Sequence, residues 1–304
     1  MNTALLFPGQ GSQSLGMGHD FYSTSSFGKA IYESANDILG YDLKDISFNG
    51  PEDKLKQTQY TQPAIFVHSY IAAKRFIEMY DLEIDGCAGH SLGEITALSI
   101  SNVIEFTDAL KIINVRATEM GKAGDKQKGT MAAILGADEN QLDEICNQQG
   151  VVVPANLNAP GQVVISGEID GINAAIKTAK SMGIRRVLPL NVSGAFHSPL
   201  MNPVKQKLSE ILDKTQFSKG KFPVVQNVNA EFQTDPEKIK ENLLNQLIMP
   251  VRWSDTILSM ANAGISRFIE CGPGKVLTGL NRRILKDSIN FNIGTVTQLD
   301  EFKL

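Results

Sequence analysis

The chain contains little cysteine, no block of like charge and no long apolar run. Its three cysteines lie far apart in 304 residues and never form a C-x-x-C pair, so neither a disulfide framework nor a zinc site is expected. The chain has 29 basic and 33 acidic residues, so it lacks the excess of basic residues that is typical of nucleic-acid-binding proteins. No apolar run approaches the roughly 18 residues of a membrane span, and the first residues show no signal-peptide pattern. We therefore expect a cytoplasmic protein with no membrane anchor.

The remaining composition is that of an ordinary folded enzyme, with 42% hydrophobic and 20% charged residues and no repeat or low-complexity tract. Short β-branched runs alternate with helical stretches, which favours an α/β fold. In the outer parts of the chain, the expected strands are 3–7, 84–90, 223–228 and 266–270, and the expected helices are 62–80, 92–101, 106–122, 199–214, 236–247, 254–263 and one from 275.

The middle of the chain has a pattern of its own. Two predicted helices, 138–149 and 169–182, alternate with four predicted strands in the order βαββαβ, which is the ferredoxin-like unit. We therefore expect a small subdomain over residues 125–192, inserted into a larger catalytic domain made of residues 1–124 and 193–304. The four strands are 129–135, 151–157, 161–167 and 184–190, and a turn at 158–160 joins the second to the third.

The strongest local signal is the pattern G-x-S-x-G at residues 89–93, between a predicted strand and a predicted helix. Such a turn exposes a serine hydroxyl, and the N-terminus of the following helix aims backbone N–H groups at a developing oxyanion. Ser91 is therefore a candidate nucleophile. The alternative is a glycine-bounded serine that only caps the helix.

A nucleophilic serine needs a base, and the chain has four histidines. His90 adjoins Ser91, where neighbouring side chains diverge. His68 lies in an apolar helix and suits a packed core, and His19 follows a glycine-rich loop that does not position it. His197 lies between a predicted strand and a predicted helix, a rigid position suited to catalysis. Elimination therefore favours His197 as the base, with a helix-capping or surface histidine as the alternative.

Two other glycine-rich segments match no nucleotide-binding pattern. Residues 9–16 do not have the G-x-G-x-x-G spacing, and the GPGK at 272–275 lacks the first glycine and the final Ser or Thr of a phosphate loop. The sequence also has no HExxH motif and no cluster of metal ligands. The chemistry that remains is a metal-free serine site for acyl transfer.

Seven motifs in order along the chain carry a resemblance to a known family. They are FPGQGSQ (7–13), TQPAIF (61–66), GHSLGE (89–94), ANLNAPGQVVISG (155–167), GAFHSP (194–199), QLIMPVRW (246–253) and ECGPGKVLTGL (270–280). With these motifs the chain resembles the malonyl-CoA:acyl carrier protein transacylases of fatty-acid synthesis and the acyltransferase domains of polyketide synthases. It departs from many relatives at Ile95, where they have an aromatic residue, and this leaves the chemistry untouched. The resemblance implies an α/β-hydrolase-like large domain with a parallel-sheet core and a ferredoxin-like insert.

The resemblance also implies roles for individual residues. Ser91 attacks the thioester of malonyl-CoA and forms a malonyl-serine, while His197 takes its proton. The backbone N–H groups of Gln10 and Leu92 hold the oxyanion. The main-chain carbonyl of Gln246 orients His197, which makes the site a dyad, and no cofactor or metal is expected beyond the two substrates.

The resemblance implies that a second group of residues selects the substrate. Arg116 in the predicted helix 106–122 would bind the malonyl carboxylate with both arms of its guanidinium, although without the family it reads as a solvated helix arginine. Phe196 would exclude a methylmalonyl branch, the alternative being that its ring only packs behind the base. Residues expected to shape the cleft are Asn156, Asn158 and Gln162.

The function implied is transfer of malonyl groups from malonyl-CoA to the phosphopantetheine thiol of acyl carrier protein, supplying fatty-acid synthesis, by an enzyme expected to be a monomer. The alternatives are a malonyl acyltransferase that serves a polyketide synthase, a serine thioesterase or hydrolase, and a non-catalytic carrier-binding protein. Because carrier proteins are acidic, we expect a local basic patch, with a solvated surface as the alternative. Its candidates are Arg282, Arg283 and Lys286, or Lys122, Lys126 and Lys128.

Overall fold

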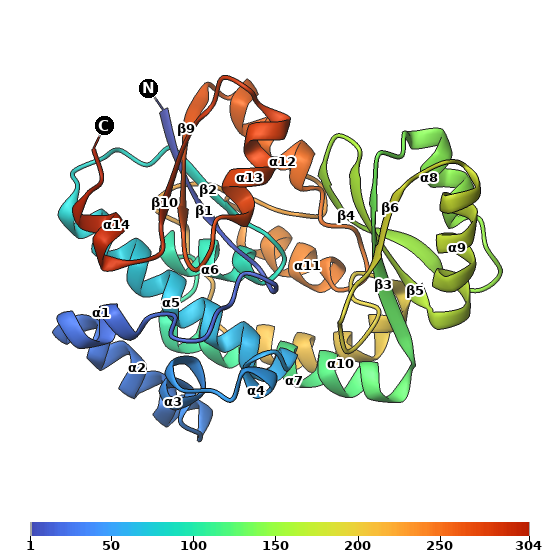
Figure 1. Ribbon diagram of the computed structural model, residues 1–304. Coiled ribbons are helices and arrows are strands. Elements are labelled where there is room, and N and C mark those ends of the chain that lie inside the picture. Colours follow the sequence, from blue (N-terminus) through green and yellow to red (C-terminus); the bar gives the residue numbers. More distant parts are fainter. Residues whose placement is uncertain (1, 304) are drawn as a thin grey trace.

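The computed structural model describes residues 2–303 (Figure 1). Its larger sheet has six strands. These strands are β1 (Asn2–Phe7), β2 (Gly86–Gly89), β7 (Val224–Val225), β8 (Phe232–Gln233), β9 (Ile265–Cys271) and β10 (Ile289–Ile293). Their order is β10-β9-β1-β2-β7-β8, and all neighbours are parallel except the antiparallel pair β7 and β8. Because β1 pairs with β2 up to Phe7 and Gly89, the loops that leave these two strands begin side by side.

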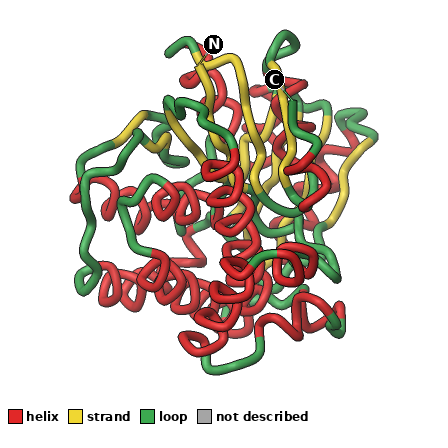
Figure 2. The backbone as a smooth tube through the Cα atoms, turned by 90° about the vertical axis from the view of Figure 1, so that its left-hand side faces the viewer, coloured by secondary structure: helices red, strands yellow, loops and turns green. Residues whose placement is uncertain are grey.

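Helices cover both faces of this sheet, which explains why β1 is apolar along most of its length. Leu5 and Phe7 of β1 belong to one core cluster, together with α5, α6 and α7, whereas Ala4 and Leu6 belong to a second one with α12 and α13. The view in Figure 2 shows the strands running side by side with helices around them. The helices named here are α5 (Thr58–Met79), α6 (Leu92–Ile100), α7 (Phe106–Lys126), α12 (Trp253–Asn262) and α13 (Val276–Ile284).

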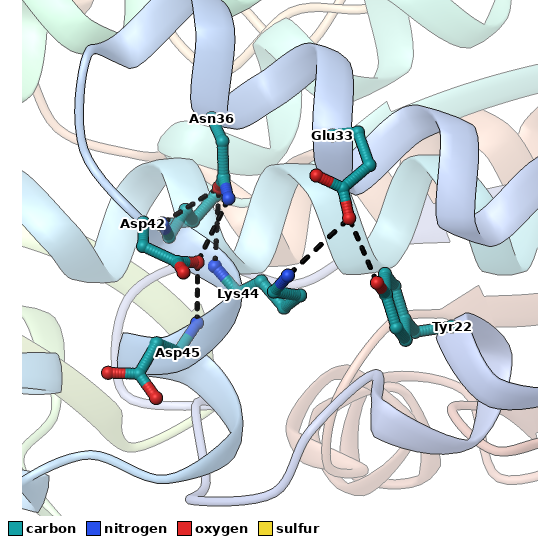
Figure 3. Close-up of polar contacts among 7 residues, drawn as sticks. Tyr22, Glu33, Asn36, Asp42, Lys44 and Asp45 are labelled. Carbon is teal, nitrogen blue, oxygen red and sulfur yellow. Dashed lines mark hydrogen bonds and ion pairs between the residues drawn. The ribbon is translucent and has the colours of Figure 1, made fainter.

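Four helices that the sequence did not predict lie between β1 and α5. They are α1 (His19–Thr24), α2 (Ser26–Leu39), α3 (Leu43–Phe48) and α4 (Glu52–Leu55). Asn36 of α2 donates a hydrogen bond to Asp42, the N-cap of α3. Glu33 of α2 accepts hydrogen bonds from Tyr22 of α1 and Lys44 of α3 (Figure 3). These polar contacts connect α2 to the helices before and after it.

The smaller sheet is antiparallel and lies to the side of the larger one (Figure 1). Its strands are β3 (Gly129–Leu135), β4 (Val152–Ala159), β5 (Gln162–Glu168) and β6 (Arg186–Pro189), in the order β4-β5-β3-β6. Helices α8 (Glu139–Cys146) and α9 (Ile169–Ser181) contribute Ile145, Ile172 and Ala175 to a separate apolar core with this sheet. This βαββαβ order is the one predicted from the sequence.

The structure corrects the predicted turn between β4 and β5. The sequence placed this turn at 158–160, but β4 continues to Ala159, which pairs with Gln162. The connection is therefore the two residues Pro160 and Gly161, and Gly161 has a left-handed backbone conformation (φ 67°). Glycine adopts that conformation without steric cost, so it permits a tighter hairpin than the one predicted.

Two further predictions about the outer elements were wrong in extent. The strand expected at 223–228 is only Val224–Val225, because the Gln226 N–H already bonds to Glu231 across the turn to β8 and the Asn227 N–H bonds to the side chain of Glu94. The helix expected at 199–214 begins as a 3-10 turn and continues as α10 (Asn202–Leu212). The remaining elements are α11 (Pro236–Gln246) and, beyond the predicted helix from 275, β10 and α14 (Val296–Asp300).

We propose that the chain divides into a catalytic domain of residues 1–124 and 193–304 and a subdomain of residues 125–192. The separate core of the small sheet supports this division, although α7 continues to Lys126, slightly past the first boundary. Backbone hydrogen bonds from β4 to Val251 attach the small sheet to the larger domain. Within residues 2–303, no helix has the length and apolarity needed to cross a membrane.

Candidate active site

Ser91 lies on the sharp turn between the end of β2 and the start of α6. Its backbone has φ 53° and ψ −103°, a conformation that residues other than glycine rarely adopt. A Cβ atom on Gly89 would overlap the backbone of Gly93, and one on Gly93 would overlap the carbonyl of Phe7. Both glycines of the G-x-S-x-G pattern are therefore required by the close approach of strand, turn and helix.

His197 lies within hydrogen-bond distance of the serine hydroxyl. The distance from Ser91 Oγ to His197 Nε2 is 2.8 Å, and His197 Nδ1 lies 2.7 Å from the main-chain oxygen of Gln246. Because a carbonyl oxygen can only accept, Nδ1 carries the proton and Nε2 presents its lone pair to the serine. Burial and the nearby charge of Arg116 lower the pKa of His197 to about 3. The imidazole is therefore neutral at physiological pH, as a general base must be.

Arg116 reaches the same hydroxyl from α7, and only 1% of its surface is exposed. Its guanidinium donates to Gln62 Oε1 at 2.7 Å, to Gln246 Oε1 at 2.9 Å and to Ser91 Oγ at 3.0 Å. Burial lowers the pKa of Arg116 to about 10, while the charge of Glu94 opposes the shift, so the group stays cationic at neutral pH. Among residues 2–303 no carboxylate lies within ion-pair distance of it. The serine thus has a buried cation beside it with no carboxylate in direct contact.

Two backbone N–H groups near Ser91 are available to hold an oxyanion. Leu92 is the first residue of α6, and the first N–H groups of a helix have no acceptor within it. Gln10 lies on the loop after β1, and its side chain donates to Thr58 Oγ1 at 3.2 Å, which holds the loop. Neither amide donates a hydrogen bond within the part of the chain that the structure describes. A Cβ atom on Gly9 would overlap the His90 carbonyl, so this loop packs directly on the serine turn.

The serine opens into a small cavity of about 110 Å³. A cavity of this volume holds several water molecules and has room for a short acyl group next to the serine. Asn156 of β4 and Phe196 line the cavity, so both the small sheet and the larger domain contribute to it. The full lining is Gln10, Gln62, His90, Ser91, Leu92, Met120, Met131, Asn156, Leu190, Val192, Phe196 and His197.

Two residues expected in the cleft behave differently from Asn156. Asn158 does not line the cavity, but its Oδ1 lies 2.8 Å from His90 Nε2, so it fixes the ring next to the serine. Gln162 lies away from the site, and its side-chain oxygen accepts a hydrogen bond from Arg283 at 2.6 Å. The reason is its place at the start of β5, beside the tight hairpin turn.

Of the other histidines, His68 takes the place the sequence suggested, whereas His19 was expected to have no element to position it and instead begins helix α1. His68 is buried in α5, with Nε2 3.0 Å from the carbonyl oxygen of Gly294. The ring of His19 packs edge-on against Phe48. Neither contacts Ser91.

Three polar residues at this site were not predicted. Gln62 lies in the TQPAIF motif, where a polar residue amid apolar neighbours is a weak signal, and it holds Arg116. Glu94 ends the GHSLGE motif and could be read as an acid in the first turn of a helix, yet it is fully buried. Asn227 is also buried, and the local sequence gives no indication of its contacts with the serine turn.

Comparisons with known proteins agree on one family. Residues 4–297 match the acyl transferase domain model. A malonyl CoA-acyl carrier protein transacylase of Staphylococcus aureus (strain MRSA252) is 41% identical over 289 residues, which are 94% of this chain and 93% of that protein. The crystal structure of an acyl carrier protein S-malonyltransferase from Vibrio cholerae superposes with a TM-score of 0.95 and 38% identity, over 100% of both chains. A malonyl-transacylase in complex with a type II polyketide synthase acyl-carrier protein gives a TM-score of 0.95 and 37% identity over 99% and 98% of the two chains. The chain therefore belongs to the acyl transferase family, among the malonyl CoA-acyl carrier protein transacylases.

Proposed function

We propose that the protein transfers the malonyl group of malonyl-CoA to the phosphopantetheine thiol of acyl carrier protein through a malonyl-Ser91 intermediate. The observation that carries this proposal is the guanidinium of Arg116, which is buried 3.0 Å from Ser91 Oγ with no carboxylate in ion-pair contact among residues 2–303. A simple esterase has no use for such a cation, whereas the free carboxylate of a malonyl group supplies its missing partner. The match in sequence and structure to malonyltransferases supports the same substrate.

In the first half-reaction the oxygen of Ser91 attacks the thioester carbon, and its proton passes to His197 Nε2. The tetrahedral oxyanion accepts hydrogen bonds from the N–H groups of Gln10 and Leu92, each worth about 2.7–4 kcal/mol of transition-state stabilisation where such donors have been removed. The carbon–sulfur bond then breaks, and the proton on His197 moves to the departing sulfur of coenzyme A. The product is a malonyl ester on Ser91.

In the second half-reaction the thiol of the carrier gives its proton to His197, and its sulfur attacks the ester carbon. The bond to Ser91 Oγ breaks, and His197 returns the proton to the serine oxygen. Arg116 binds the malonyl carboxylate in both halves with the two arms of its guanidinium, for which the bond to Ser91 Oγ must be exchanged. The Gln246 carbonyl keeps the lone pair of Nε2 aimed at the serine throughout.

The chain itself supplies the base, the oxyanion donors and the cation for the carboxylate, so we propose that the two substrates are the only small molecules the reaction needs. We also propose that the enzyme works in the cytoplasm. Its three cysteines are unpaired, as is usual in a reducing compartment, and two of them are buried.

The test is to mix the protein with malonyl-CoA and measure intact mass with and without phosphopantetheinylated carrier protein. We expect a malonyl adduct on the enzyme that disappears when carrier is added, with the malonyl group recovered on the carrier. Ser91→Ala should show no adduct. An adduct on Ser91→Ala would contradict the mechanism, and release of free malonate instead of malonyl-carrier would indicate a hydrolase.

One observation favours a second carrier. The solved malonyl-transacylase in complex with a type II polyketide synthase acyl-carrier protein is as similar in fold as the bacterial acyl carrier protein S-malonyltransferase. The chemistry at Ser91 is the same for both carriers. Competing a fatty-acid carrier against a polyketide carrier for the malonyl-enzyme would decide between them.

A further inference from the structure

The strained backbone of Ser91 needs constraints on every side of the turn, and the secondary structure supplies only some of them. A residue with a side chain keeps φ 53° and ψ −103° only where its surroundings enforce it. Helix α6 fixes the carboxyl side, because the Ser91 carbonyl accepts the N–H of Glu94 at 3.1 Å. On the amino side, the His90 N–H donates to the Phe7 carbonyl of β1 at 2.9 Å, but on the side of β7 the pairing of β2 ends at Ala88 and Val225. Beyond that last pair, the constraint on the β7 side comes from a side chain.

Asn227 provides that constraint and is fully buried. Its Oδ1 accepts the N–H of Ser91 at 2.8 Å, and its Nδ2 donates to the carbonyl of Gly89 at 2.8 Å. The Ser91 N–H can only donate and the Gly89 carbonyl can only accept, so a neutral primary amide satisfies both. The side chain in effect continues the pairing of β2 with β7 beyond its last backbone pair.

The surroundings hold Asn227 itself in place. Its N–H donates to Glu94 Oε2 at 2.6 Å, and its carbonyl accepts the N–H of Arg252 at 3.0 Å. Burial raises the pKa of Glu94 to about 6, so at neutral pH this acceptor remains a carboxylate. Gln246 Nε2 donates to Asn227 Oδ1 at 3.3 Å and to the Ser91 carbonyl at 3.1 Å.

The same glutamine connects Asn227 to the rest of the site. The main-chain oxygen of Gln246 binds His197 Nδ1, and its side-chain oxygen accepts from Arg116. One buried hydrogen-bond network therefore joins the serine turn, the base and the cation. Asn227 lies in it without lining the cavity and without a hydrogen bond to Ser91 Oγ.

We propose that Asn227 is a positioning residue that holds the serine turn in its reactive conformation, and so sets the direction of Ser91 Oγ and of the Leu92 N–H. The inference rests on the proposed acyl transfer at Ser91. Its test, however, uses a reagent that does not depend on malonyl-CoA. A fluorophosphonate forms an oxygen–phosphorus bond to an activated serine, fluoride leaves, and the serine proton passes to the base.

The experiment compares wild type, Asn227→Ala and Asn281→Ala for the rate of fluorophosphonate labelling at Ser91. Asn281 is the matched control, because it is also fully buried and its hydrogen bond to Asn290 lies in another part of the fold. We expect Asn227→Ala to label about 10²-fold more slowly, the loss typical of a reactive group misplaced by about 1 Å, and Asn281→Ala to label within twofold of wild type. Affinity for malonyl-CoA, measured in a Ser91→Ala background, should change less than twofold when Asn227→Ala is added.

A second variant keeps the test decisive if Asn227→Ala does not fold. Asn227→Asp has nearly the same shape and keeps the acceptor for the Ser91 N–H, but its carboxylate cannot donate to Gly89, so we expect at least tenfold slower labelling. Labelling of the folded variants at the wild-type rate would overturn the proposal, and so would a parallel loss of labelling and malonyl-CoA affinity, which indicates a general structural role. A wild type that labels but does not transfer malonyl groups would instead refute the proposed function alone.

Discussion

Replacing Arg116 with alanine tests the basis of substrate selection. The substitution removes the only cation hydrogen-bonded to Ser91 within residues 2–303, and it also leaves the side-chain oxygens of Gln62 and Gln246 without a donor. The second effect slows every acyl substrate, because Gln246 also orients His197. Only the first distinguishes malonyl from acetyl groups, since an acetyl group has no carboxylate. The ratio of the two activities therefore isolates the contribution of the carboxylate.

The size of that contribution follows from the geometry. A charge-assisted hydrogen bond is worth about 1.5–3 kcal/mol, and each 1.4 kcal/mol is about a factor of ten. Only 1% of the Arg116 surface is exposed, so the contact between its guanidinium and the malonyl carboxylate is shielded from water. The interaction energy is therefore not reduced by solvent, as it is for ion pairs on the surface. We expect the ratio of kcat/KM for malonyl-CoA over acetyl-CoA to fall about ten- to hundredfold in Arg116→Ala.

The assay measures kcat/KM for both CoA esters with saturating carrier protein, on wild type, Arg116→Ala and Arg116→Lys. Lysine keeps the charge but not the two-armed geometry, so its ratio should lie between the other two. Malonate should raise the thermal midpoint of wild type but not of Arg116→Ala, because a ligand stabilises only the fold that binds it. Equal losses on the malonyl and acetyl esters would refute the reasoning and make Arg116 a structural residue.

Three further predictions concern other parts of the molecule. Phe196 lines the small cavity, so Phe196→Ser should raise methylmalonyl transfer relative to malonyl transfer in a competition assay; a parallel fall of both would mean that the ring only packs behind the base. Burial lowers the pKa of His68 to about 4 from a usual 6.5, so the unfolded chain binds the extra proton first and stability falls as pH drops from 6.5 towards 4. Between pH 7 and pH 5 this lowers the free energy of unfolding by about 2 kcal/mol. His68→Gln can keep a donor to the Gly294 carbonyl but does not titrate, so in denaturant titrations it should lose about 2 kcal/mol less over this range than wild type; an unchanged pH dependence would contradict the prediction. Charge reversal in the true carrier-docking group should raise the KM for carrier at low salt and spare acylation by malonyl-CoA, and a group whose reversal changes neither is excluded. The two groups are Arg282, Arg283 and Lys286, and Lys122, Lys126 and Lys128.

The sequence by itself determined the features that depend on neighbouring residues. The glycines around Ser91 predicted a strand–turn–helix because the turn has no room for side chains there, and the overlaps at Gly89 and Gly93 confirm that reason. The βαββαβ order of the small sheet followed from alternating local patterns. Local patterns failed where one residue changes the chain direction, as at Gly161, and where helices of only six residues, such as α1 and α3, depend on contacts with their neighbours.

Only the tertiary structure decided how the site is assembled. Ser91 meets His197 across 106 positions of the chain, and Gln246 meets Arg116 across 130. No spacing in the sequence indicates such contacts, because they depend on which helices face the ends of β1 and β2. Taken alone, Arg116 reads as a solvated helix residue, and Asn227 gives no signal at all. Both acquire a role because the fold buries them. A buried polar group must find its hydrogen-bond partners within the protein, and these partners then fix its position.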